Sequence, residues 1–192
     1  MKILAVQSRM GIGDTVIFLP FIKALSKKFN SPISILVKEN SKANQYLHQT
    51  KYIDKILTLE RDNKTNNRHG GFFGIFKLAN DLKKYKFDKI FIFNSSLRFN
   101  LVAKISGIPQ IYQYPLFAKN KQHIVEAPKK FLKKNLDLDI NEDPEVQIDS
   151  DLISKAAQKF QIDKNTTNIL LGIGGSGPTK RIPAKTFLSV ID

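Results

Sequence analysis

Apolar residues along the chain fall into two alternating patterns. Short apolar runs bounded by turn residues predict buried strands, and apolar positions spaced three or four apart predict amphipathic helices. The predicted strands are Ile3–Val6, Ser34–Val37, Asp54–Leu59, Lys89–Phe93 and Ile111–Tyr114. The predicted helices are Asp14–Phe29, Ser41–His48, Phe72–Tyr85, Phe99–Ile105 and Ile124–Leu136. This alternation predicts an α/β fold, a parallel sheet with helices on both of its faces.

The helix predicted over Phe72–Tyr85 follows a loop that has no apolar residue. This loop, RDNKTNNRHGG at residues 61–71, ends in two glycines and is typical of an exposed connection. We expect the helix to bury one side against the sheet. The residues on that side are Phe73, Phe76, Leu78, Ala79 and Leu82.

The pattern changes after residue 136. Acidic residues crowd into residues 137–151 together with a proline, which predicts a linker and a domain boundary. A helix at Leu152–Phe160, a strand at Asn168–Ile173 and a helix from Pro183 follow. We expect one domain over residues 1–148. Residues 149–192 are expected to form a linker helix and the truncated beginning of a second α/β domain, because one strand, loop and helix do not bury a core.

Composition narrows the class of protein. The 192 residues are 42% hydrophobic, and no apolar run reaches the roughly 18 residues that indicate a membrane span. The N-terminus enters a strand directly and shows no secretory signal pattern. The absence of cysteine excludes disulfides, thiolate chemistry and metals held by cysteine. We therefore expect a cytoplasmic protein.

The net charge of +14 is distributed unevenly. Residues 1–136 contain 25 Lys and Arg against 8 Asp and Glu, whereas residues 137–192 contain 6 against 9. The positive charge of residues 1–136 favours an anionic partner, which could be nucleic acid, a phosphorylated substrate or an anionic membrane surface. The alternative is that many of these lysines are simply solvated.

Two glycine-containing turns carry the candidate chemistry. Gly11 and Gly13 predict a tight turn after the first strand, and Asp14 follows at the start of the helix. In an open α/β sheet this turn lies at the carboxyl edge, where ligands bind; the alternative is that Asp14 is only a helix cap. The second turn, Gly174–Lys180, combines backbone N–H groups, hydroxyls and cations and suits a phosphate. An ordinary turn with surface cations fits this segment equally well.

Four segments resemble the bacterial ADP-heptose:lipopolysaccharide heptosyltransferases, glycosyltransferase family 9. They are MKILAVQSRMGIGDTVIFLPFIKALSKKF, YIDKILTL, FDKIFIFNSSLRFNLVAKISGIPQIYQY and NILLGIGGSGPTKRIPAKTF. The resemblance implies the Rossmann-like N-terminal half of a GT-B fold plus the first strand, loop and helix of the second domain. In such a protein the first domain binds the acceptor and the second binds the nucleotide sugar.

Matched by position, the resemblance implies roles for single residues. Asp14 takes the place of the catalytic base, and Gly175, Ser176 and Lys180 take the places of the groups that meet the donor diphosphate. Ile182 departs from the family, which usually has Trp there. The implied reaction is an inverting, metal-independent transfer of a sugar, with heptose expected. The donor is a nucleotide diphosphate sugar such as ADP-heptose, the acceptor is of lipopolysaccharide core type, and no further cofactor is needed. We expect the 192 residues alone to be inactive.

Cations in the carboxyl-edge loops are the candidate acceptor ligands. We expect Arg61, Lys64, Arg68 and Arg98 to hold phosphates or sugar carboxylates of the acceptor, and Arg98 also matches the family's arginine after the fourth strand. The alternative for residues 61–71 is a solvated connector. Lysines of the basic helix at residues 124–136 are expected either at the anionic inner face of the membrane or in solvent.

Two other functions remain open at this point. One is a GT-B transferase with a different donor or acceptor. The other is a non-catalytic, basic Rossmann-like module that binds nucleic acid, although the chain has no recognised nucleic-acid motif and we expect no such partner. The three histidines, His48, His69 and His123, show no metal-ligand spacing, so no metal site is expected.

Overall fold

The computed structural model describes residues 1–9, 11–61, 67–116, 123–163, 165–172 and 181–191, without the side chains of residues 190 and 191. It divides the chain into two units, Met1–Ile148 and Asp149–Asp192. The first unit contains a sheet and its covering helices, and the described residues of the second form two α-helices.

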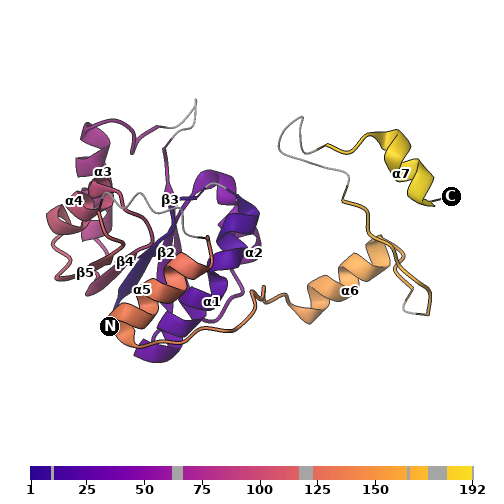
Figure 1. The fold of residues 1–192 in the computed structure, drawn as a ribbon, viewed down its shortest axis with the longest axis horizontal. Helices are drawn as coiled ribbons and strands as arrows, with labels where there is room; N and C mark the ends of the chain where they lie inside the picture. Colours follow the sequence, from indigo (N-terminus) through magenta and orange to yellow (C-terminus); the bar gives the residue numbers. More distant parts are fainter. Residues whose placement is uncertain (10, 62–66, 117–122, 164, 173–180, 192) are drawn as a thin grey trace. The chain divides into compact units, whose positions relative to one another are not determined.

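A sheet of five parallel strands forms the centre of the first unit, in the order β3-β2-β1-β4-β5 (Figure 1). Its strands are β1 (Ile3–Val6), β2 (Ile33–Lys38), β3 (Ile53–Leu59), β4 (Lys89–Ile92) and β5 (Gln110–Gln113). Its helices are α1 (Ile12–Phe29), the short turns η1 (Glu39–Ser41) and α2 (Ala43–Tyr46), α3 (Phe73–Lys83), α4 (Leu97–Ile105) and α5 (Glu126–Leu136). The α/β fold class predicted from the sequence is therefore confirmed.

Alternate side chains of the central strand face opposite layers of helices, as the period of two in a strand requires. Ile3 and Ala5 of β1 pack with apolar residues of α1 and α5, whereas Leu4 and Val6 pack with those of α3 and α4. Figure 1 shows where these four helices lie along the sheet. All four residues of β1 are buried. The continuous apolar run at the N-terminus is thus explained by a strand that is covered on both faces.

The buried side of α3 differs from the predicted one. Leu78, Ala79 and Leu82 are buried as predicted, but Phe73 and Phe76 are exposed and Gly74 and Ile75 are buried in their place. The physical reason lies at Gly74, where an added Cβ would come within 2.3 Å of the backbone carbonyl carbon of His69. This close approach turns Gly74 inward, and the neighbouring phenylalanines consequently point outward.

The predicted linker at residues 137–151 is wrong for its first part. Ile140 is buried, and Leu138 and Val146 pack against the core beneath α1 and α5. The Glu142 carboxylate pairs with Lys23 at 3.1 Å and with Lys27 at 2.5 Å on α1. The acidic stretch up to Ile148 therefore belongs to the first unit, held by apolar packing and by opposite charge.

The second unit contains α6 (Ser150–Lys159) and α7 (Ala184–Ile191). No residue of α6 is buried. Residues 168–172 form no strand, so the prediction of a strand at Asn168–Ile173 is wrong for its described part. A parallel strand needs neighbours that complete its hydrogen bonds, and the described part of this unit supplies none.

Across the described chain, no helix combines the length and the apolar character that a membrane crossing requires.

Candidate functional site

The order of the strands places a switch point beside β1. The chain continues from β1 to β2 and β3 on one side, whereas β4 and β5 lie on the other side. In open α/β sheets, ligands bind outside the carboxyl ends of the strands at this position. The segments that leave β1, β4 and β5 are therefore the first place to look for a site.

Asp14 lies at this edge, in the first turn of α1. The N-cap of α1 is Gly11 and not Asp14, but Asp14 Oδ2 accepts a hydrogen bond from the Gly11 backbone N–H at 3.0 Å, so Asp14 is the acidic partner in a capping box. The side chain is half-buried, and among the described residues its Oδ1 takes part in no hydrogen bond. The buried Gln7 donates from Nε2 to the Asp14 carbonyl at 3.2 Å, which fixes the segment between strand and helix. Asp14 thus contributes one oxygen to the capping box and keeps the other available.

The explanation predicted for the two glycines is wrong. Gly11 is the N-cap with an extended backbone (φ −100°), α1 begins at Ile12, and Gly13 lies inside its first turn. Neither has a positive φ, so no left-handed turn requires them. Gly11 instead leaves room, because an added Cβ would lie 3.2 Å from Oδ2 of Asp14.

A pocket of about 620 Å³ opens beside the switch point. Arg9 after β1 lines it together with Lys130 and Lys134 of α5. In the described part of the chain none of these three cations takes part in an ion pair. The two lysines are four residues apart and therefore lie one turn apart on the same side of their helix. The pocket is suited to an anionic group.

The inner wall of the pocket is aromatic. Phe93, Tyr114 and Phe131 meet edge to face, with ring centroids 5.0–6.0 Å apart. The Tyr114 hydroxyl is buried without a hydrogen-bond partner among the described residues, and this burial raises the pKa of Tyr114 above its ordinary value although Arg9 acts in the opposite direction. Burial thus favours the neutral form of this hydroxyl.

The rim of the pocket is fixed by amide side chains. Asn94 donates from Nδ2 to the Ser8 hydroxyl at 3.1 Å, which ties the segment after β4 to the segment after β1. Gln113 donates from Nε2 to the carbonyls of Asn94 (3.1 Å) and Ser96 (2.9 Å). The three strand ends are therefore joined by side chains before any ligand arrives.

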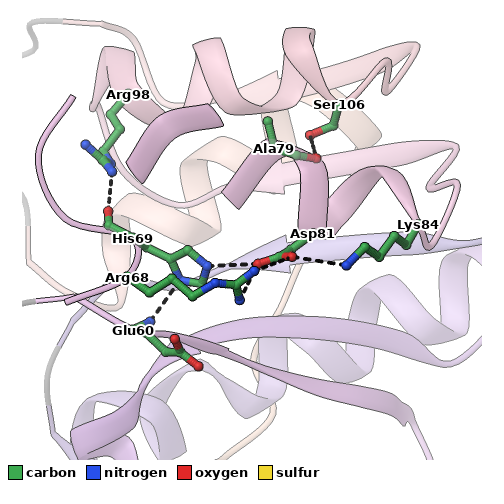
Figure 2. Close-up of polar contacts among 8 residues, drawn as sticks. All are labelled: Glu60, Arg68, His69, Ala79, Asp81, Lys84, Arg98 and Ser106. Carbon is green, nitrogen blue, oxygen red and sulfur yellow. Dashed lines mark hydrogen bonds and ion pairs between the residues drawn. The ribbon is translucent and has the colours of Figure 1, made fainter. Parts of the chain in front are cut away.

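Two of the predicted acceptor cations already have partners within the protein. Arg68 makes a two-point contact with the Asp81 carboxylate, at 2.8 and 2.7 Å (Figure 2). Arg98 donates to the backbone carbonyls of Gly71, at 2.7 Å, and His69. Both arginines thus hold the end of the loop that precedes α3.

The buried His69 connects these contacts. Its Nδ1 accepts a hydrogen bond from the backbone N–H of Glu60 at 3.1 Å, so its proton lies on Nε2, which is 3.1 Å from Asp81 Oδ2 (Figure 2). Burial alone would raise the pKa of Asp81, but hydrogen bonds from His69 and Arg68 outweigh it and hold that pKa below its ordinary value. We call Glu60, Arg68, His69 and Asp81 the loop clasp.

The remaining predicted site residues are only partly covered by the structure. Arg61 is half-exposed, and its backbone N–H donates to the Leu59 carbonyl at 3.0 Å. Lys64 lies outside the described residues, as do the predicted donor ligands Gly175, Ser176 and Lys180. Their roles stay predictions. In the described residues no group of three His, Asp or Glu side chains is placed to hold a metal ion.

Sequence reasoning missed Arg9 as a candidate site residue and expected Lys130 and Lys134 either at a membrane surface or in solvent. The signal for Arg9 was its place three residues after a buried strand, at the carboxyl edge. For the lysines, nothing in the sequence shows that α5 returns to this same edge. That proximity is a property of the tertiary fold.

Comparisons with known proteins agree on the fold. No protein-family model matches the chain, and no curated protein sequence matches it. Among solved structures it is similar to the glycosyl transferase family 9 protein of Veillonella parvula DSM 2008, with a TM-score of 0.77 and 19% identity over 100% of this chain and 59% of that one. It is also similar to the E. coli ADP-heptose LPS heptosyltransferase II, with a TM-score of 0.65 and 16% identity over 99% and 62%. For the E. coli heptosyltransferase WaaC with ADP, the TM-score is 0.57 and the identity 15% over 100% and 63%.

The chain spans about three fifths of the length of these structures. At this level of identity the likeness concerns the fold. Over its whole length the chain has the fold of the glycosyltransferase family 9 and heptosyltransferase structures.

Proposed function

We propose that the chain comprises the acceptor-binding domain and the beginning of the donor-binding domain of an inverting, metal-independent glycosyltransferase. The donor is a nucleotide diphosphate sugar, with ADP-heptose expected, because the similar structures include an ADP-heptose heptosyltransferase and a heptosyltransferase with ADP. The acceptor is an anionic molecule of lipopolysaccharide core type. The observation that carries this proposal is the available carboxylate oxygen of Asp14 at the switch point.

In this proposal Asp14 is the general base. Its Oδ1 takes the proton from a hydroxyl group of the acceptor. At the same time the oxygen of that hydroxyl forms a bond to the anomeric carbon of the donor sugar, and the bond between the anomeric carbon and the diphosphate breaks. The leaving diphosphate carries the negative charge. Lys180, with Gly175 and Ser176, is proposed to stabilise that charge by hydrogen bonding in place of a metal ion.

The acceptor is proposed to bind in the pocket beside the switch point. Arg9, Lys130 and Lys134 would hold its anionic groups, and the aromatic wall suits the apolar face of a sugar ring. Arg61 and Lys64 remain candidate acceptor ligands on the neighbouring loop. In this scheme Arg68 and Arg98 do not contact the acceptor directly. They hold the described end of the loop at residues 61–71 in place.

A lipid-linked acceptor implies work at a membrane surface. We propose a cytoplasmic protein that contacts the inner membrane face peripherally. The net charge of +17 over residues 1–136 favours such a contact with anionic lipids.

The decisive test is Asp14→Asn in a protein that carries a complete donor domain. The amide oxygen still accepts from the Gly11 N–H, but the side chain cannot take a proton. Loss of a general base costs about 10²–10⁴ in rate. The transfer of heptose from ADP-heptose to an anionic core acceptor should therefore collapse, with the melting temperature unchanged.

The matched control is Asp149→Asn, because the Asp149 carboxylate also accepts a backbone N–H at the start of a helix, that of Asp151 at 2.9 Å. This variant should keep its rate. An Asp14→Asn variant as active as the control would return Asp14 to the role of a helix cap.

A further inference from the structure

Three phenylalanines at the start of α3 form an aromatic cluster on the surface. Phe72 is 69% exposed, Phe73 76% and Phe76 44%. The ring of Phe72 meets those of Phe73 and Phe76 edge to face, with centroids 6.0 and 5.7 Å apart. We call these residues the aromatic trio. Large apolar side chains that gather on a surface mark an interaction site far more often than isolated ones do.

The trio is held outward by a rigid support. Its helix starts after Gly71, which has a φ of +58° and whose carbonyl accepts from Arg98. Two residues further back, the loop clasp fixes His69 against Asp81 of the same helix (Figure 2). Because Gly74 touches the backbone of His69, α3 cannot rotate to bury Phe73 in its place. The outward direction of these rings is thus built into the fold.

Positive charge predominates along the helix that carries the trio. Between Gly71 and Lys86 the sequence has four lysines and one acid, Asp81, whose carboxylate is engaged by Arg68 and by Lys84. Lys77 is exposed and follows Phe76 directly, and the other three lysines lie at the far end of α3. The neighbouring α4 contains Arg98 and Lys104 and no acidic residue. It lies beside α3, since the Ser106 hydroxyl that follows it donates to the Ala79 carbonyl at 3.2 Å (Figure 2). Its exposed side adds Leu97, Leu101 and Ile105, spaced four residues apart.

We propose that the aromatic trio inserts into the interface of an anionic lipid bilayer, with the adjacent Lys77 and the excess positive charge of α3 and α4 facing the headgroups. Phenylalanine and leucine side chains framed by cations are the combination that binds such interfaces. A protein partner of ordinary composition would not require this excess of positive charge. The inference rests on the proposed peripheral contact and deepens it by naming its residues, which lie at the start of α3 and not on the basic helix at residues 124–136.

Tryptophan fluorescence can test this site alone, because the chain contains no tryptophan. Phe73→Trp places a reporter in the trio, and Phe160→Trp places a reporter at a similarly exposed position in the other unit. With vesicles of phosphatidylglycerol and phosphatidylcholine, the emission of Phe73→Trp should shift to the blue and that of Phe160→Trp should not. Vesicles of phosphatidylcholine alone should produce a much smaller shift.

Co-sedimentation with the same anionic vesicles measures the energetic contribution. Replacing Phe72, Phe73 and Phe76 together by serine should lower binding at least about tenfold, as expected for the apolar area removed. Serine is tolerated there because the three side chains are exposed. Phe160→Ser, on exposed α6, is the matched substitution and should leave binding unchanged.

Several results would overturn the proposal. Unchanged binding of the triple variant would assign the membrane contact to charge alone, and a loss with Phe160→Ser as large as that of the triple variant would assign it to α6. A Phe73→Trp emission already shifted without vesicles, or a self-association abolished by the serines, would show that protein covers the trio. Failure of the proposed function is separable in a protein that carries a complete donor domain, since Asp14→Asn should bind vesicles normally and the triple variant should still transfer sugar to a water-soluble acceptor.

Discussion

The two units of the chain differ in how far they bury their large apolar side chains. In Met1–Ile148, Leu4, Leu25 and Phe91 have no exposed surface, whereas in Asp149–Asp192 Leu170 is 97% exposed and Phe160 67%. Both units contain amphipathic helices. The units differ in whether another element packs against the apolar side of the helix. The apolar sides of α1 and α3 pack against the sheet, whereas no residue of α6 is buried. An amphipathic pattern therefore predicts a helix, but it contributes stability only where another element packs against it.

The largest expected effect comes from replacing one phenylalanine by alanine in each unit and comparing the losses of stability. Phe91 lies fully buried in β4, stacked on Tyr112 with centroids 4.6 Å apart. Phe91→Ala should lower the free energy of unfolding by about 3–5 kcal/mol, through lost transfer energy and the cavity left behind. Urea denaturation followed by circular dichroism measures this loss.

Phe160→Ala is the matched substitution in the second unit. Its ring is mostly exposed, so the free energy of unfolding should change by no more than about 0.5 kcal/mol. Similar losses for the two variants would mean that Phe160 is covered in solution, and the contrast between the units would no longer hold.

The next effect tests whether polar contacts, as well as apolar burial, hold the first unit at its functional edge. Asp81→Asn removes the charge that Arg68 contacts at two points. Hydrogen bonds to charged groups contribute about 1.5–3 kcal/mol each, and the Asp81 side chain is only 21% exposed. We expect a loss in that range at neutral pH. The exposed Asp139→Asn, which removes one of the two carboxylates that pair with Lys133, should lose less.

The loss caused by Asp81→Asn should also depend on pH. The pKa of Asp81 is lower in the folded protein than in the unfolded chain, where it is about 3.9. The stabilisation is therefore fully present above about pH 4 and disappears as the pH falls through the folded pKa. Urea midpoints of the two proteins should converge in acid. A constant difference down to the lowest accessible pH would show that the carboxylate charge is not what holds the loop.

The limits of sequence reasoning follow the same contrast. The strand Ile3–Val6 and the helix that ends at Phe29 were predictable from their sequences. The strand is a continuous apolar run, and the helix has one broad apolar side. Phe73 was misplaced because FFGIF offers apolar residues to every side of a helix, and a backbone contact at Gly74 decided between them. Residues 168–172 were misread because their apolar run resembles that of β1, but a strand exists only where neighbouring strands complete its hydrogen bonds.

The site was predictable to a similar extent. Asp14 follows from local order along the chain, as a carboxylate just after the first strand. The pocket does not, because Arg9 and Lys130 are more than a hundred residues apart and meet only through the return of α5 across the sheet. The clasp partner of Arg68 was hidden for the same reason. A sequence shows which groups are charged, and the fold decides which of them are already paired.

The smallest expected effect concerns the place where the covered unit ends. Tyr52 donates from its hydroxyl to the Glu145 carbonyl at 3.4 Å, and the adjacent Lys51 N–H donates to Gln147 at 2.9 Å. Burial, with the nearby Glu145 and Glu142, raises the pKa of Tyr52 to about 12. In the unfolded chain the phenol has a pKa of about 10. The stabilisation is thus complete below about pH 10 and is lost as the pH rises through the folded pKa, since only the unfolded chain then gives up the proton readily.

Tyr52→Phe should therefore match the parent protein at neutral pH, because it loses one long hydrogen bond and keeps its ring in place. Between pH 10 and about 12 its urea midpoint should fall less than that of the parent. Tyr114, whose pKa is also raised by burial, is present in both proteins. Both proteins should therefore lose the same additional stability at alkaline pH when Tyr114 ionises. Equal alkaline losses, or a tyrosinate absorbance change for residue 52 near its ordinary pKa, would show that residues 142–148 do not cover Tyr52. The border between covered and uncovered chain would then lie before Glu142, and the acidic stretch would be the linker that its composition first indicated.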